Sequence, residues 1–192
     1  MLPENVLSSS VVSGSFLYPR NIPKSPLFDY EMGGLDIEDS SAGLRVKAWR
    51  GQVIENSIVL DADAVPPVTI ITVPEIREFS FTFDQSMRPF ITYVLENDEA
   101  YYYWYDTTIP GYRTTQLAAG TSSPRCAIDD NRNSQAGASD IILAYVRGFR
   151  LYFRAQRDRY LIEYAPAPDT GFRRLAQIGM SNKNRFQFLG IP

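Results

Sequence analysis

From residue 43 onward, short stretches of β-branched and aromatic residues recur along the chain, separated by polar turns and by prolines such as Pro74. Several of them alternate apolar with polar positions, the pattern of an antiparallel strand with one buried face and one solvated face. This pattern predicts an all-β fold of antiparallel hairpins. Strands are expected over residues 44–49, 53–60, 68–73, 79–83, 90–95, 100–105, 141–146, 149–155 and 160–164. Residues 171–178 fit one or two turns of helix.

Residues 1–42 lack a strand or helix period, because isolated apolar side chains lie between prolines and small polar residues. We therefore expect an extended N-terminal arm over residues 1–42, a β domain over residues 43–165 and a C-terminal tail over residues 166–192. The arm can pack on a neighbouring subunit, the preferred interpretation, or fold back on its own domain. Its candidate interface residues are Phe16, Leu17, Tyr18, Leu27, Phe28 and Tyr30.

A weak internal repeat relates residues 93–106 to residues 145–158, since both begin Tyr-Val and both end in aspartate. Arg50-Gly51 followed by Asp61 mirrors Arg147-Gly148 followed by Asp158. Each unit has the pattern of a hairpin. The repeat has two possible explanations. Any two antiparallel hairpins can resemble one another by chance, or the units build a β-sandwich or a blade-like partial propeller. Three units are fewer than the roughly four blades that a propeller needs, so a propeller would require several chains.

The chain has 192 residues, no histidine and a single cysteine, Cys126. The missing histidine excludes Ser-His-Asp and Cys-His catalysis and histidine-ligated metal sites. One cysteine permits no internal disulfide, and Cys126 is expected to be a buried small hydrophobe. No apolar run approaches the roughly 20 residues that span a bilayer, so no membrane span is expected. The first residues lack the layout of a signal peptide, so no export is expected.

Paired carboxylates could in principle hydrolyse glycosides. The candidates fall at a predicted hairpin tip, where carboxylates are solvated, or at strand ends, where aspartate caps turns. Neither position suits a desolvated acid facing a nucleophile, so we expect no catalytic residues, no cofactor and no enzymatic activity. The tip residues are Glu96, Asp98 and Glu99, and the strand-end residues are Asp61, Asp106 and Asp158.

Oxygen ligands at alternate positions begin at Asp129, and Asp140 falls twelfth, which is the spacing of a calcium loop. Ser134 occupies the position where the sharp turn needs glycine, and strand patterns flank the segment. An ordinary loop with Asx turns is the preferred interpretation, so no metal site is expected, while calcium binding over Asp129–Asp140 stays open.

Residues 101–105, Tyr-Tyr-Tyr-Trp-Tyr, form the densest aromatic run. In a strand, Tyr102 and Trp104 face one way and the other three tyrosines face the opposite way. One set should belong to the core. The other set could form a subunit interface or a sugar-stacking platform, and Tyr102 with Trp104 is the candidate glycan platform.

Charge is unevenly distributed along the chain. Residues 1–86 carry six basic and twelve acidic side chains, whereas residues 141–192 carry nine basic and three acidic ones. Arg150, Arg154 and Arg157 crowd one predicted hairpin and are candidate interface residues. Complementary packing of one subunit's acidic part on another's basic part is preferred over nucleic-acid binding, because the whole chain is acidic and no lysine joins the cluster.

Two segments carry a resemblance to a known class of proteins. They are residues 34–44 leading into residues 46–51, and residues 139–148 leading into residues 151–160, together less than a quarter of the chain. Both resemble segments of tailed-bacteriophage structural proteins from the tail tip, baseplate or nozzle. The resemblance implies a non-enzymatic virion component, made in the host cytoplasm, that assembles as a ring with copies of itself and other tail proteins. The rival from another class is a carbohydrate-binding, or glycan-hydrolysing, module acting on a host-surface glycan.

Overall fold

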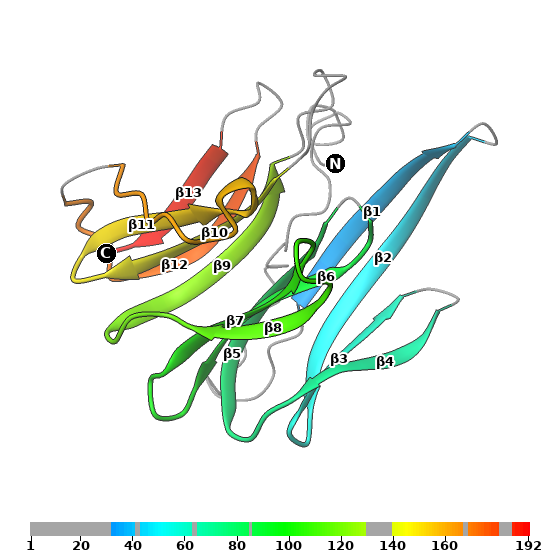
Figure 1. Ribbon diagram of the computed structural model, residues 1–192, viewed down its shortest axis with the longest axis horizontal. Helices are drawn as coiled ribbons and strands as arrows, with labels where there is room; N and C mark the ends of the chain where they lie inside the picture. The colour runs from blue at the N-terminus through cyan, green and yellow to red at the C-terminus, as the bar shows by residue number, and fades with distance from the viewer. Residues whose placement is uncertain are drawn as a thin grey trace.

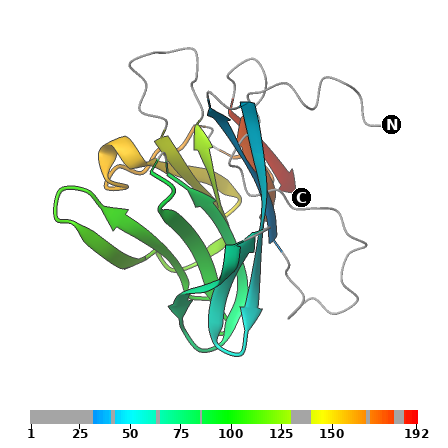
Figure 2. The ribbon, with the colours of Figure 1, turned by 90° about the vertical axis from the view of Figure 1, so that its right-hand side faces the viewer.

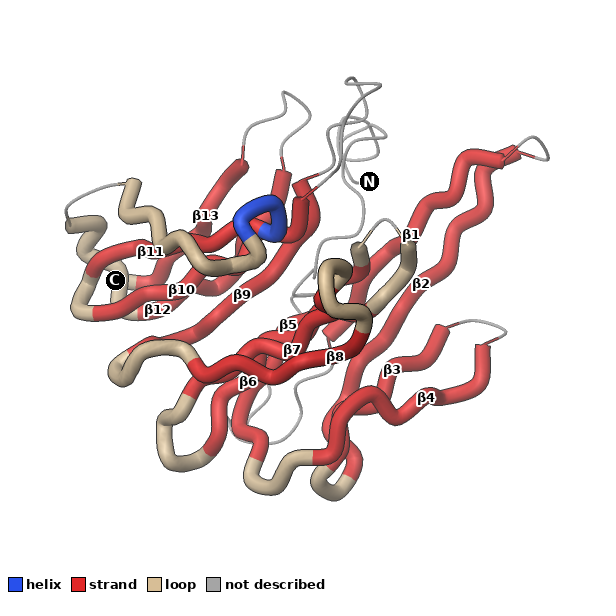
Figure 3. Tube along the Cα trace, in the orientation of Figure 1, coloured by secondary structure: helices blue, strands red, loops and turns tan. Residues whose placement is uncertain are grey.

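The computed structural model describes residues 32–40, 43–62, 65–84, 86–129, 140–166, 169–180 and 186–192, with residues 32–40 and 43–48 described by their backbone. The all-β prediction is confirmed. Within these ranges the chain forms thirteen strands and a single 3-10 turn, η2 (Gln156–Asp158). Figure 3 draws the strands in red and this turn in blue. Every pairing between the strands is antiparallel.

The strands form four sheets in chain order. The first sheet holds β1 (Met32–Ser40), β2 (Gly43–Ile54), β3 (Ser57–Ala62) and β4 (Val65–Thr72). The second holds β5 (Ile76–Phe83), β6 (Pro89–Leu95), β7 (Ala100–Asp106) and β8 (Gly111–Gln116). The third holds β9 (Thr121–Asp129), β10 (Asp140–Arg147) and β11 (Arg150–Ala155), and the fourth holds β12 (Arg174–Met180) and β13 (Phe186–Ile191).

The second sheet is buried on both faces because alternate residues of its strands enter two different cores. One face packs on the first sheet through Phe79, Phe81, Ile91 and Tyr93, against Ile58 and Leu60. The opposite face packs on the third sheet through Phe90, Val94, Tyr102 and Trp104. The second sheet therefore lies between the first and the third, as the two views in Figures 1 and 2 show.

The third sheet also uses both faces. Leu143 and Tyr145 of β10 point toward the second sheet, whereas Ala144 and Val146 point toward the fourth. Leu175 and Ile178 of β12 complete this last core. Each sheet therefore packs on the next one along the chain, the first on the second, the second on the third and the third on the fourth. This arrangement corresponds to the sandwich alternative, extended to four layers.

The three repeat units coincide with hairpins, as expected. Residues 93–106 span β6 and β7, residues 145–158 span β10, β11 and η2, and the unit from Arg50 to Asp61 spans β2 and β3. In the last unit Arg50 and Asp61 are Cα partners and their side chains form an ion pair with an Nε–Oδ1 distance of 3.1 Å.

Both predicted domain boundaries are wrong. Residues 32–40, assigned to the arm, form β1 and pair with β2 over nine positions. The candidate interface residues of the arm, Phe16 to Tyr30, lie outside the described residues. At the other end, the predicted tail contains β12 and β13, whose Leu175 and Phe188 pack against the third sheet.

Two predictions of local structure are also wrong. Residues 171–178 do not form helical turns, because β12 pairs with β13 and buries Leu175 and Ile178. Residues 160–164 are not a strand, and only Tyr164 forms a single bridge with Phe153. In the described part of the chain, no helix is long and apolar enough to cross a membrane.

Candidate functional site

Tyr102 and Trp104 belong to the core and not to a surface platform. Their exposed fractions are 3% and 8%, and both pack against Tyr160, with ring centroids at 5.4 and 5.3 Å. The indole Nε1 of Trp104 donates a hydrogen bond of 3.2 Å to the hydroxyl of Thr115. The predicted glycan platform on these two residues is therefore wrong, since the third sheet covers that face of β7.

The opposite face of β7 and β8 carries what we call the tyrosine face, formed by Tyr103, Tyr105 and Tyr112. The rings of Tyr103 and Tyr112 stack with centroids 4.7 Å apart and planes 3° from parallel. Tyr105 meets Tyr112 edge to face, with centroids 5.1 Å apart. Tyr112 is 42% exposed, so this face presents an ordered and accessible aromatic surface.

Arg88 extends the tyrosine face with a fixed positive charge. Its guanidinium lies 4.4 Å above the ring of Tyr105, a cation–π contact. Its Nε donates a 2.7 Å hydrogen bond to Asp84, a buried carboxylate that also accepts the backbone N–H groups of Ser86 and Arg88. These bonds hold Arg88 in place over Tyr105 and pair its charge with Asp84.

A second cluster surrounds the carboxylate of Glu163, which follows η2 in the chain. Arg147 donates to both of its oxygens, at 2.6 and 3.2 Å, and Arg154 donates to Oε2 at 3.2 Å. The hydroxyl of Tyr145 also donates to Oε2. Arg154 further donates to the Tyr160 carbonyl at 3.0 Å, so the cluster fastens the segment after β11 to the third sheet.

This cluster stabilises the ionised form of Glu163. Burial alone would raise the pKa of Glu163, but the hydrogen bonds from Arg147, Tyr145 and Arg154 outweigh burial and lower the pKa to about 2. Burial and the bond to Glu163 raise the pKa of the Tyr145 hydroxyl above its ordinary value. The arrangement keeps one group charged and the other protonated across the physiological range, which suits a structural clamp.

Replacing Glu163 with glutamine should lower the free energy of unfolding at pH 7 by about 1–3 kcal/mol, the usual contribution of hydrogen bonds to a charged group. Because the folded-state pKa of Glu163 is depressed, its contribution is present above its ordinary pKa of 4.5 and disappears as the pH falls toward 2. Urea unfolding between pH 7 and pH 2 should show the two stability curves converging in acid. If the difference in unfolding free energy between the two proteins stays constant from pH 7 to pH 2, the ionisation of Glu163 does not stabilise the fold.

Asp106 ends β7 and is almost completely buried. Its Oδ1 accepts the hydroxyl and backbone N–H of Thr108, and its Oδ2 accepts Arg113 at 3.0 Å and Arg159 at 2.7 Å. The Thr108 hydroxyl, with Arg159, holds the pKa of Asp106 well below its usual range although burial opposes this shift. The residue caps a turn, as expected for a strand-end aspartate, and also joins the second sheet to the chain after η2.

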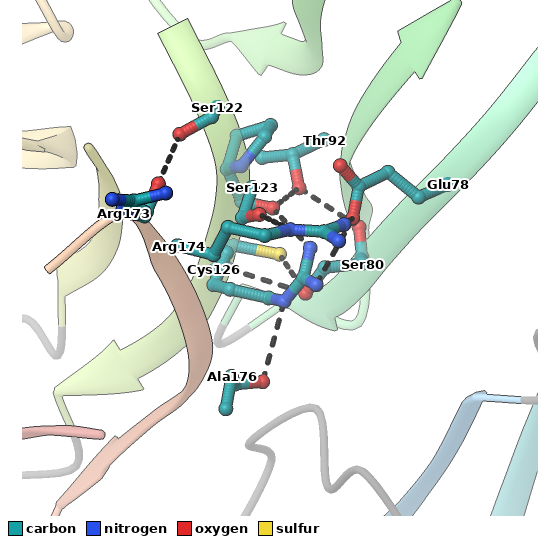
Figure 4. Close-up of polar contacts among 11 residues, drawn as sticks. Glu78, Ser80, Thr92, Ser122, Ser123, Cys126, Arg173, Arg174 and Ala176 are labelled. Atoms are coloured by element: carbon teal, nitrogen blue, oxygen red, sulfur yellow. Dashed lines mark hydrogen bonds and ion pairs between the residues drawn. The ribbon is translucent and has the colours of Figure 1, made fainter. Parts of the chain in front are cut away.

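A buried polar layer lies where β5, β9 and β12 meet (Figure 4). The side chains of Glu78 and Arg125 are only 3% and 4% exposed and form an ion pair with an oxygen–nitrogen distance of 3.1 Å. Arg174 reaches the same carboxylate at 3.5 Å and donates to the Ser123 hydroxyl at 3.0 Å. These polar side chains, which the sequence analysis did not single out, tie the second, third and fourth sheets together.

Cys126 lies in this layer and is buried, as expected. Its backbone N–H donates to the Ser80 hydroxyl at 3.3 Å. Burial raises the pKa of the Cys126 thiol to about 12, so the residue stays protonated and is a poor nucleophile.

The three candidate interface arginines have different surroundings. Arg154 lies in the Glu163 cluster with 20% of its side chain exposed, and its contact with a partner stays a prediction. Arg157 is exposed and forms an ion pair with the buried carboxylate of Asp140. Arg150 is exposed on β11, opposite Arg147 across the strand pair.

The possible calcium loop lies mostly outside the described residues, because residues 130–139 are not described. Its two ends, Asp129 and Asp140, are Cα partners in β9 and β10. Among the described residues, no group of three or more carboxylate or thiol side chains is placed to hold a metal ion.

Three comparisons with known proteins find no match. No family model, no curated protein and no solved structure is similar to this chain. Any functional conclusion therefore depends on the geometry and on the sequence.

Proposed function

We propose that this protein is a structural subunit of a bacteriophage tail or baseplate and that it catalyses no reaction. The observation that carries this proposal is the pairing of the buried carboxylates. In the described part of the chain, each buried carboxylate forms an ion pair with at least one arginine. The four carboxylates are Glu78, Asp84, Asp106 and Asp140.

Such pairing argues against acid catalysis at neutral pH. A catalytic general acid needs a raised pKa, obtained by burial without a positive partner. The pKa shifts of Asp106 and Glu163 are both downward, because hydrogen-bond donors stabilise their charged forms. Glu78 joins β5 to β9, and Asp106 joins β7 to Arg159 after η2, a cohesion between distant elements that suits a load-carrying assembly component.

The resemblance to tail proteins supports the same proposal. The described residues of 34–51 lie on β1 and β2, and residues 140–160 lie on β10, β11, η2 and the two residues after η2. The partners would be copies of this chain and other tail proteins, and the location would be the virion tail.

Removing residues 2–30 should leave a folded β protein that no longer enters phage particles. All described strands start at Met32 or later, so the truncation removes the candidate interface residues from Phe16 to Tyr30 and leaves the four sheets intact. Circular dichroism of the purified truncation and complementation of a deletion phage would measure the two parts separately. Normal incorporation of the folded truncation would contradict a connecting role for this segment.

Carbohydrate binding is the second candidate, and the tyrosine face favours it. Exposed aromatic rings beside a fixed arginine can stack on sugar rings and bond their hydroxyl or carboxylate groups. A glycan array should show saturable binding that is lost in Tyr112→Ala but kept in Tyr164→Ala, which removes a comparably exposed tyrosine that stacks on Phe153 of the third sheet. Binding with this pattern would favour the second candidate, and absence of binding would support the structural role.

A further inference from the structure

We infer that two copies of this protein pair through their last strands, with β13 of one copy antiparallel to β13 of the other across a two-fold axis. The two-stranded fourth sheet of each copy then becomes half of a continuous four-stranded sheet. The inference goes beyond the proposed function, because it concerns the contact between two copies and holds whether or not the chain belongs to a phage tail.

The fourth sheet is a two-stranded hairpin, which is the smallest possible sheet. A hairpin of this size is marginally stable by itself and gains stability from further strands. On one face of β13, Phe186 and Phe188 pack against the core between the third and fourth sheets, yet both stay partly exposed. On the other face, Leu189 and Ile191 are 60% and 49% exposed. A further strand beside β13 would therefore cover apolar area on both faces.

The two edges of this sheet differ, because the edge at β12 is already in contact with β9. The hydroxyl of Ser122 donates to the carbonyl of Arg173, immediately before β12, at 2.9 Å. Nε of Arg125 donates to the carbonyl of Ala176 within β12 at 3.4 Å, and Figure 4 shows both contacts. In the described part of the chain, no strand pairs with the outer side of β13. The open edge of the fourth sheet is therefore β13.

An open edge presents unpaired backbone groups to any extended chain, and proteins usually block it with proline, with charge or with a covering segment. Three other edge strands of this protein are blocked in these ways. β4 contains Pro66 and Pro67, and β8 carries the exposed Arg113. β11 forms a bridge at Phe153 with Tyr164. β13 has none of these features, since its sequence, Phe-Gln-Phe-Leu-Gly-Ile, includes no proline and no charged residue.

The absence of charge on β13 favours a second copy as the partner. In a two-fold antiparallel pair, residues near the axis lie beside the same residues of the other copy, so a charged strand would meet its own like charges. β13 avoids this repulsion and offers the second copy the same apolar side chains in return. The contact is isologous, and it closes at two copies because β12 is occupied by β9.

Leu189 is the residue at which this pairing can be tested. Residues paired across an antiparallel sheet point to the same face, so the exposed Leu189 lies on the same face as Leu189 of the second copy. With the axis near the middle of β13, the two leucines are directly opposite or diagonal neighbours, with Cβ atoms about 4.5–8 Å apart. A charge introduced at this position therefore meets the same charge in the second copy.

Opposite charges at Leu189 test the inference in the purified full-length protein. The natural protein should form dimers in sedimentation equilibrium experiments. Leu189→Lys and Leu189→Glu, each alone, should dimerise at least about tenfold more weakly, because like charges then meet across the axis. An equal mixture of the two variants should dimerise again, because lysine then meets glutamate. Mixing would not rescue a contact between β13 and any other surface.

Leu161→Lys is the matched control, since it adds a charge at a leucine that is 76% exposed in the segment after η2. It should dimerise like the natural protein, and circular dichroism should show that all variants keep the β fold. Three results would overturn the inference: a natural protein that stays monomeric at every concentration, a mixture that stays dissociated while both variants are folded, or an equal loss of dimers in Leu161→Lys.

Discussion

Replacing Arg125 with methionine should lower the free energy of unfolding by about 3–5 kcal/mol, because the substitution leaves the buried Glu78 carboxylate without its main partner. Glu78 would keep only Arg174, at 3.5 Å and on a half-exposed side chain. The same substitution removes the hydrogen bonds that Arg125 donates to the carbonyls of Pro124 and Ala176. Urea denaturation at pH 7 measures the effect.

Two control variants isolate the buried charge as the cause. The double variant Glu78→Leu/Arg125→Met removes both charges and should recover most of the lost stability, since an apolar pair of similar volume often replaces a buried ion pair at little cost. Arg50→Met breaks the more exposed pair with Asp61 and should cost about 0–1 kcal/mol. A loss below about 1 kcal/mol in Arg125→Met would show that the buried pair does not hold the sheets together.

Gly51→Ala should destabilise the protein by about 1–3 kcal/mol, the usual cost of overpacking a core. Gly51 lies on β2, directly against the aromatic side chains of β5. A Cβ atom at this position would lie 2.8 Å from a ring carbon of Phe81 and 2.9 Å from carbons of Phe79 and Leu60. The added methyl group would push the first sheet away from the second.

Gly179→Ala provides the matched comparison in the fourth sheet. A Cβ atom on Gly179 would have no neighbour within 4 Å, so the substitution should change stability by less than about 0.5 kcal/mol or increase it slightly. Thermal unfolding of the two variants side by side measures the difference. Equal effects would contradict the close packing of the first two sheets.

The hairpins were predictable from the sequence because their strands alternate or are strongly apolar. β6, β7 and β10 all lie where the pattern placed them, since Phe90, Trp104 and Leu143 mark buried positions in β-rich segments. The expected strand ranges did not include β1, β8, β9, β12 or β13. Tyr112 is the one large apolar residue of β8, and the strand forms because β7 provides its hydrogen-bonding partner.

The boundaries of the β domain were not predictable for a related reason. β12 and β13 bury Leu175, Ile178 and Phe188 against the third sheet, and such tertiary contacts are not contained in the local pattern. Leu175 and Ile178 are spaced three apart, which fits a helix, but a register shift between Leu175 and Gln177 lets both point inward from a strand. An irregularity of this kind has no clear mark in the sequence.

The candidate sites were only partly predictable. Alternation separated Tyr102 and Trp104 from the other tyrosines of β7 but could not decide which set faces a neighbouring sheet. The clustered arginines were visible in the sequence, whereas their partners were not, because Glu163 meets Arg147 and Arg154 only after the chain turns back beyond η2. Exposed Tyr112 and buried Glu78 lie in segments whose composition is ordinary.

The most direct test of the central claim is cryo-electron microscopy of tails purified from the phage whose genome encodes this chain. The account predicts density for the described strands of this chain in several copies around the tail axis. Complete, infectious tails in which no density and no peptide of this chain can be found would contradict it.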